Sequence, residues 1–157
     1  MSGLSVQLEA MGRRIADIER RLRSQTRVGK VVEVNAAEGL ARVQINEGDQ
    51  PFVTGWIPWE EPAAGANKTH NPPSVGQQVR IFSETGDLAD ASIQGSLNSA
   101  VNGRPSAAGD EFVMAAVGEA RIAITGGGSE ITLTVGGSTV TINSASISLS
   151  AARIDLN

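Results

Sequence analysis

The chain has 157 residues, with 13 Lys and Arg residues against 17 Asp and Glu residues, and a formal net charge of -4. This acidic balance argues against a nucleic-acid-binding protein, which usually presents a basic patch, and the lack of cysteine excludes disulfides and thiolate chemistry. No stretch approaches the roughly 20 apolar residues of a membrane span, and the first residues lack the basic and apolar regions of a secretory signal.

The N-terminal region, residues 1–26, is predicted to form a helix with one apolar seam. Apolar side chains recur at alternating spacings of four and three residues, which is the a/d pattern of a coiled coil. Arg14 and Glu19 fall at flanking positions, where they can pair between helices. Two alternatives are an amphipathic helix packed on its own domain and a seam that docks in a partner's groove. The seam consists of Leu4, Leu8, Met11, Ile15, Ile18 and Leu22.

Residues 27–98 are predicted to form a small β-barrel of the OB type. Five short apolar segments are separated by turns and by one long loop rich in proline and glycine, 60–76. Trp56 and Trp59 are expected in the barrel core or at a subunit interface, rather than as stacking platforms for nucleic acid, because Glu60 and Glu61 follow them. The predicted strands are 28–34, 40–45, 52–59, 78–83 and 91–97.

A linker, 99–112, leads to a C-terminal region, 113–157, in which large aliphatic residues alternate strictly with Thr, Ser and other small or polar residues. Such alternation indicates short strands with one apolar face, and glycine pairs between the segments permit tight turns. The aliphatic positions are Ile122, Ile124, Ile131, Leu133, Val135, Val140, Ile142, Ile147, Leu149, Ile154 and Leu156.

The sequence contains no further helix or second sheet to cover this apolar face. A single copy would therefore be a narrow meander with its apolar face in water, whereas three copies around one axis would bury it. We expect an intertwined trimeric β-helix, a triangular prism in which strand edges pair between chains. An ordinary meander packed against the barrel is the alternative. The predicted fold class is mainly β, with a helix, an OB barrel and this prism in order.

In this order of elements, the sequence resembles the baseplate assembly protein V family, the central spike of contractile phage tails and R-type bacteriocins. The matching segments are TRVGKVVEVNAAEGLARVQI at 26–45, WIPW at 56–59, PPSVGQQVRIFSETGDLADASIQGSL at 72–97 and the C-terminal Thr/Ser/Ile repeat.

The resemblance implies a homotrimer in a virion baseplate, assembled in the host cytoplasm, attached to the tail hub and other baseplate proteins, and driven into the host envelope on contraction. Longer family members end in a histidine-bearing apex that holds iron. The single histidine here is His70, far from the C-terminus, so neither apex iron nor another cofactor is expected. The prism is expected to be blunt and capped by a separate tip protein.

Residues that could carry catalysis or metal binding are sparse. His70 has no Cys or second His with which to complete a metal site. Glu60 and Glu61 are adjacent, whereas glycoside hydrolysis needs two carboxylates facing each other across a cleft. The glycine run at 126–129 is not followed by the Lys of a phosphate-binding loop. We therefore predict neither an enzyme nor a metal or nucleic-acid site, with a type VI secretion spike or an OB-fold module for nucleic acid or sugar as alternatives.

Overall fold

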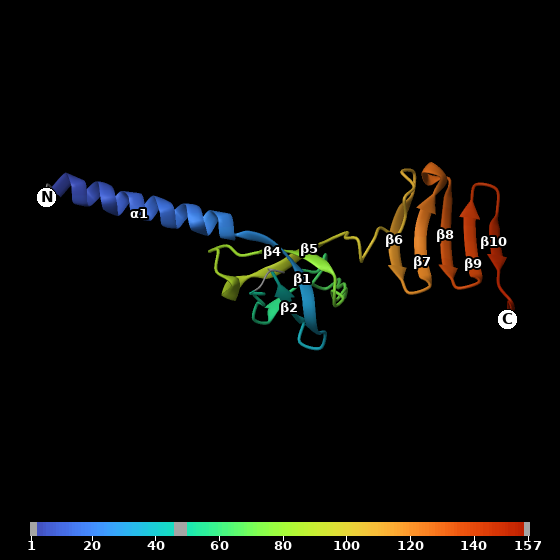
Figure 1. Cartoon of the computed structure of the whole chain (residues 1–157). Coiled ribbons are helices and arrows are strands. Elements are labelled where there is room, and N and C mark those ends of the chain that lie inside the picture. The colour runs from blue at the N-terminus through green and yellow to red at the C-terminus, as the bar shows by residue number, and fades with distance from the viewer. Residues whose placement is uncertain (1–2, 46–49, 156–157) are drawn as a thin grey trace. The chain divides into compact units, whose positions relative to one another are not determined.

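The computed structural model describes residues 3–45 and 50–155 of the chain. The chain divides into two compact units, residues 1–103 and residues 104–157. The first unit holds one α-helix and a five-stranded sheet, and the second holds a separate five-stranded sheet (Figure 1). The prediction of a mainly β chain with one N-terminal helix is thereby confirmed.

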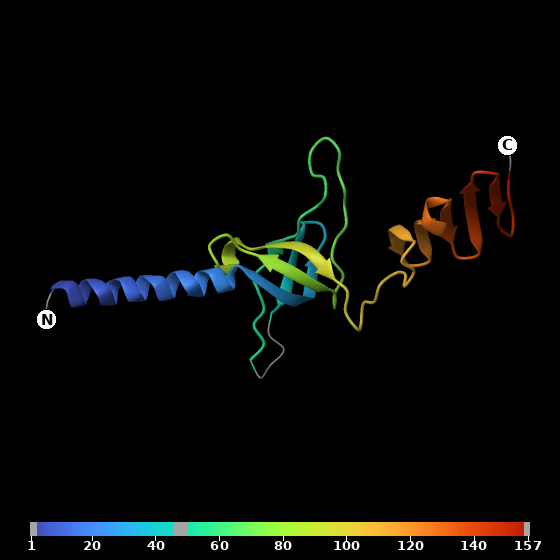
Figure 2. The same cartoon turned by 90° about the horizontal axis from the view of Figure 1, so that it is seen from above.

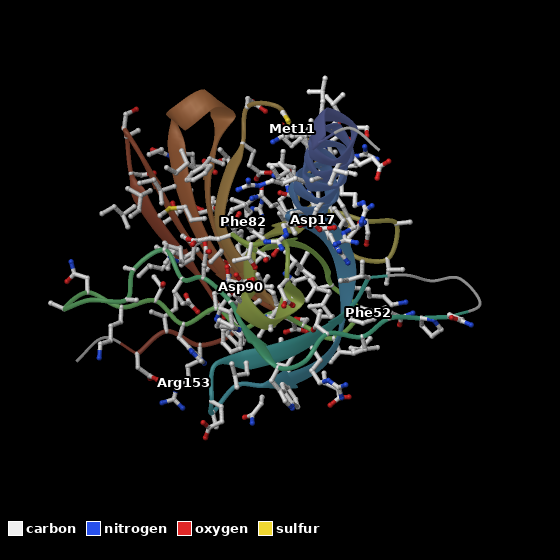
Figure 3. All side chains as sticks on the ribbon, turned by 90° about the vertical axis from the view of Figure 1, so that its left-hand side faces the viewer. Met11, Asp17, Phe52, Phe82, Asp90 and Arg153 are labelled. Atoms are coloured by element: carbon white, nitrogen blue, oxygen red, sulfur yellow. The ribbon has the colours of Figure 1, made fainter. Side chains whose placement is uncertain are left out.

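The helix α1 spans Gly3–Ser24 and contains no buried residue. Ion pairs between residues four apart line its polar surface, such as Glu9–Arg13 at 3.5 Å and Glu19–Arg23 at 3.0 Å. Two of its arginines lie in the last turn, where positive charge is favoured by the helix dipole. Met11 and Asp17, on the seam and on the polar surface respectively, are labelled in Figure 3.

The first sheet closes into a small barrel. Its strands are β1 (Thr26–Asn35), β2 (Leu40–Gln44), β3 (Ile57–Pro58), β4 (Gln78–Phe82) and β5 (Ser92–Leu97). They pair antiparallel in the order β3-β2-β1-β4-β5. A parallel bridge between Trp59 and Ile93 joins the two outer strands, and the Glu60 amide donates to the Ile93 carbonyl at 2.9 Å. This connectivity is that of a five-stranded OB barrel.

The barrel interior is filled by alternate residues of the strands, as the pattern of the sequence predicts. β1 and β2 come so close together at Gly29 that a Cβ there would lie 2.5 Å from Cγ1 of Val43 and 2.6 Å from the Gln44 carbonyl oxygen. Only glycine fits this position. The buried core consists of Val31, Ala41, Val43, Ile57, Val79, Ile81, Ala91 and Ile93.

The third strand is much shorter than the predicted segment 52–59. Before β3, a bridge joins Val53 to Gln44 of β2. Thr54 then makes two hydrogen bonds to Val43 of β2. Its backbone amide donates to the Val43 carbonyl at 2.9 Å, and its side-chain Oγ1 accepts from the Val43 amide at 3.0 Å. A hydroxyl replaces a backbone carbonyl in the ladder, and the regular strand is interrupted there.

Between β4 and β5 the chain makes a tight acidic turn. Asp87 accepts from the Ala89 amide at 3.0 Å and caps the short 3-10 helix η1 (Leu88–Asp90). Asp90, labelled in Figure 3, accepts hydrogen bonds from the hydroxyls of Ser83 and Thr85. These bonds, that from Ser83 first, lower the pKa of Asp90. The acidic residues therefore organise this turn.

The second unit is an antiparallel meander. Its strands are β6 (Phe112–Val117), β7 (Ala120–Thr125), β8 (Glu130–Val135), β9 (Ser138–Asn143) and β10 (Ile147–Ser150), and neighbours in the sequence are neighbours in the sheet. The turn after β7 is the 3-10 segment η2 (Gly126–Gly128), in which all three glycines have positive φ. Side chains rarely adopt this conformation, which accounts for the glycine run.

Two features of this sheet differ from the prediction. β6 falls partly in the predicted linker, because its Ala-rich sequence has weak alternation and a bulge between Val113 and Ala115. Ile154 and Leu156 were expected on a further strand, but residues 151–155 form no strand, and Leu156 lies outside the described residues. Arg153 instead pairs with Asp155 at 2.9 Å, two residues away.

The strands hydrogen-bond within one chain. β7, β8 and β9 each have a partner strand on both sides, so pairing between chains is left to the outer edges of β6 and β10. An intertwined arrangement of three chains stays a prediction.

Candidate functional site

The apolar seam of α1 is exposed along its whole length. Its six residues are each between 50% and 65% exposed, and none contacts a buried core. Asp17 pairs with Arg21 at 3.1 Å, and Glu19 pairs with Arg23. Among the described residues, Arg14 has neither an ion pair nor a side-chain hydrogen bond, so its predicted pairing with Glu19 of another helix stays a prediction.

The apolar face of the second sheet is a grid of three cross-strand rows, because residues that pair across successive strands fall on the same face. The first, the isoleucine row, consists of Phe112, Ile124, Ile131, Ile142 and Ile147. The second, the central row, consists of Ala115, Ile122, Leu133, Val140 and Leu149. The third, the small-residue row, consists of Val117, Ala120, Val135 and Ser138.

Much of this face is open to solvent. Exposure reaches 71% at Ile147, 63% at Phe112 and 61% at Val135, and it remains near 40% for Ile131 and Leu133 in the middle of the sheet. Beyond β10, Ile154 returns toward the small-residue row and is 47% exposed. A contiguous apolar surface of this kind marks an interaction site in a soluble protein.

The opposite face of the sheet is polar. Its rows are made mostly of Thr and Ser, such as Thr132 paired with Thr141, and Thr141 paired with Ser148. Near β6 the linker is fastened to the sheet: the Gly127 amide donates to the Asp110 carbonyl at 3.1 Å, and Glu111 pairs with Arg121. Hydrogen bonds from Arg121 and then Ser106 lower the pKa of Glu111. Only the aliphatic face is thus left to be covered.

The two tryptophans occupy different environments. Trp59 packs against the barrel core, and its Nε1 donates to Oε1 of Glu61 at 2.7 Å. Trp56 is 46% exposed, and the Arg42 guanidinium lies over its ring, 5.9 Å from the centroid. Arg42 also pairs with Glu33 at 3.0 Å. One tryptophan therefore belongs to the barrel core, and the other presents a stacked surface.

The adjacent carboxylates after Trp59 have structural partners. Glu60 accepts from Oγ of Ser92 at 2.9 Å. Glu61 accepts from the Asn71 amide, the Thr69 hydroxyl and Trp59, each at 2.7 Å. These bonds lower the pKa of Glu61, with the Asn71 amide as the largest cause and proximity of His70 as the smallest. Glu61 thereby holds the two ends of the long loop that Figure 2 shows extending from the barrel.

Part of the apolar face is not apparent from the sequence. Three of the missed positions, Phe112, Ala115 and Val117, lie on β6, where a bulge breaks the alternation. The other two, Ala120 and Ser138, have small side chains. Ala and Ser lack an apolar signal of their own, and β6 was assigned partly to the linker. Continuing the alternation back through 120 and forward through 138 would have found two of these positions.

Two kinds of feature are absent from the described residues. No helix within residues 3–45 and 50–155 has the length and apolar character needed to cross a bilayer. In the same ranges, no group of three or more His, Asp or Glu side chains is placed to hold a metal ion.

Comparison with known proteins gives two findings. Residues 27–97, which contain the barrel, match the family model described as the type VI secretion system/phage-baseplate injector OB domain. The chain is also similar to the Spike protein of Escherichia phage P2, with 34% identity over 96 residues. That match covers 61% of this chain and 44% of the phage protein, so the chain spans less than half the length of this relative.

Proposed function

Since the two comparisons confirm the resemblance to the baseplate assembly protein V family, with its OB domain at residues 27–97, we propose that the chain is the central spike of a contractile phage tail baseplate. Three copies form the particle, the barrels attach to the tail hub and neighbouring baseplate proteins, and the C-terminal sheets form a prism. Contraction drives this prism into the host envelope, and a separate tip protein caps it. The role needs no cofactor and no catalytic residue.

The observation that carries the proposal is the uncovered apolar face of β6–β10. A sheet that is polar on one face and aliphatic on the other needs a partner surface. Each aliphatic side chain brought out of water contributes about 1.5–3 kcal/mol when fully buried. Three copies of the same face around one axis supply that cover with no further protein.

A spike also has to resist force. In this sheet β7, β8 and β9 have no free edge, so opening the meander requires breaking ladders of backbone hydrogen bonds. Exposed edges are where sheets pair wrongly or unravel. The arrangement therefore suits a rod that is pushed through an envelope.

The test is the mass of the purified chain in solution. Multi-angle light scattering is expected to give three times the 16.3 kDa of one chain, and the particle is expected to survive detergent on a gel until it is heated. A monomer, or a dimer that dissociates readily, would contradict the proposed trimeric spike.

A second candidate is a spike of a type VI secretion system, because the matching family model covers both kinds of injector. The two differ in the particle that contains the chain. Mass spectrometry of purified phage tails from the source strain is expected to detect the chain beside sheath and tube proteins. Its presence in secretion sheaths and not in tails would favour the second candidate.

A further inference from the structure

The two flanks of the apolar face of the second unit differ in side-chain size. One flank, the isoleucine row, carries only Phe and Ile, whereas the opposite flank, the small-residue row, carries Val, Ala and Ser. A partner surface with side chains of equal size would not match a face whose side chains are large on one flank and small on the other. The difference in side-chain size says how two copies can fit together.

A hollow lies on the small-residue side of the face. It has a volume of about 270 Å³, between β8, β9, β10 and the segment that follows β10. Val135, Ser138, Leu149 and Ile154 are among the residues that line it, and most of its surface is apolar. Ser138 presents a side chain much smaller than those of Val135, Leu149 and Ile154 around it, which leaves room above it for a large one.

From these two observations we propose that the isoleucine row of one copy packs into the hollow over the small-residue row of the next copy. The partner is a second copy of this chain, and the contact is head-to-tail, so that each copy gives one flank and receives the other. Heterologous contacts of this kind close into a ring when the rotation fits. The inference rests on the proposed trimeric spike and specifies how its three sheets interlock.

The opposite arrangement, with like rows in contact, fills space poorly. Isoleucine rows facing each other would crowd at one flank, and overpacking a core costs roughly 1–3 kcal/mol per site. Small rows facing each other would leave voids at the other flank, which also destabilises. When the large side chains of one copy pack against the small side chains of the next, the side-chain volume is the same at every corner of the prism.

Addition of a strand cannot replace this contact in the middle of the sheet. β7, β8 and β9 already have hydrogen-bonded neighbours on both sides. A second copy can therefore cover these strands only through the side chains of the face. The large and small flanks then decide its orientation.

The chain contains no cysteine, so engineered cysteines report contacts without background. Ser138 and Ile142 stand at the two flanks of the same strand, β9. In the head-to-tail ring, Ser138→Cys of one copy faces Ile142→Cys of the next. The full-length double variant is treated with a short bis-maleimide and run on a denaturing gel, with the two single variants as matched controls.

The double variant is expected to give a covalent trimer as its main product, while both single variants remain monomeric on the same gel. A covalent dimer from either single variant means that like rows meet, and overturns the inference. So does the failure of both this pair and the second pair described below to crosslink while light scattering shows a trimer, an outcome that leaves the proposed spike intact. If light scattering shows that the unmodified chain is a monomer, both the head-to-tail packing and the proposed trimeric spike are contradicted.

A second pair of cysteine positions, on another strand, tests the same contact if the β9 variants misfold or if neighbouring copies are displaced by one strand. Ala120→Cys and Ile124→Cys occupy the same two flanks on β7. The same pattern of products is expected: a trimer from the double variant and monomers from the singles. If neither pair crosslinks in a trimeric particle, the head-to-tail packing is wrong.

Discussion

Glu61 illustrates how a residue that resembles catalytic chemistry in the sequence has a structural role in the fold. Adjacent carboxylates after a tryptophan could suggest acid and base catalysis, but three donors hydrogen-bond to the Glu61 side chain. The Asn71 amide and Thr69 come from the far end of the loop, so the carboxylate ties this end to the barrel. The sequence analysis rejected catalysis, but it had no means of finding these donors, because they are separated from Glu61 by eight and ten residues.

The lowered pKa of Glu61 gives a pH-dependent prediction. A carboxylate whose pKa is lower in the folded chain stabilises the fold above its ordinary pKa, 4.5, and this contribution is lost as the pH falls through the folded value. Glu61→Gln is therefore expected to lower the unfolding temperature of the barrel at pH 7 and to have a smaller effect near pH 3. Tryptophan fluorescence follows the barrel alone, because Trp56 and Trp59 are the only tryptophans.

Glu38→Gln is the matched control for this variant, since it also removes one negative charge but lies in the exposed turn after β1. It is expected to leave the unfolding temperature close to that of the wild type at both pH values. An equal loss of stability at pH 7 and pH 3 in Glu61→Gln would show that the carboxylate form is not what stabilises the loop.

At the scale of elements, α1 is readily predicted from the sequence, but its stability is not explained by the contacts within one copy of the chain. Its apolar spacing predicts a helix within residues 1–26, and the structure places the helix at Gly3–Ser24. Yet no residue of α1 is buried, and helices without tertiary packing are marginal in water. The seam between Leu4 and Leu22 therefore accounts for the helix only if something covers it.

A charged residue in the seam tests whether the helices cover each other. Ile15→Asp would place three carboxylates near one axis of a three-helix coil, which is unfavourable in a desolvated seam. Far-ultraviolet circular dichroism of the purified chain is expected to lose helical signal. Ala16→Asp, one position along and outside the seam, is the control and is expected to retain it. Equal spectra for the two variants would mean that the isolated chain does not form the coil.

The strands show where prediction from sequence reached its limit. Apolar segments bounded by turns located β1, β2, β4 and β5, and strict alternation located most of β7–β10. It failed where pairing was decided by something other than alternation: a Thr54 side chain that replaces a backbone acceptor before β3, and a bulge that obscures β6. Alternation within a strand also does not give the register between neighbouring strands. The three rows of the apolar face are therefore seen only in the structure.

At the scale of the whole molecule, the two units are expected to respond differently to dilution. The barrel has its own buried core and should unfold at a temperature that is independent of protein concentration. The second unit keeps its aliphatic face exposed in a single chain, so in the proposed trimer its stability comes from association. Association stabilises by mass action, and a transition that depends on it shifts upward as the concentration rises.

Calorimetry across a hundredfold range of protein concentration is thus expected to show one fixed and one moving transition. Ile57→Ala removes a buried barrel side chain, which costs about 2–5 kcal/mol and should lower the fixed transition by roughly 10 °C or more. Leu133→Asp, in the central row, should abolish the moving transition while the tryptophan signal of the barrel stays unchanged. If neither transition depends on concentration, the apolar face is not covered by sister copies, and the trimeric spike loses its physical basis.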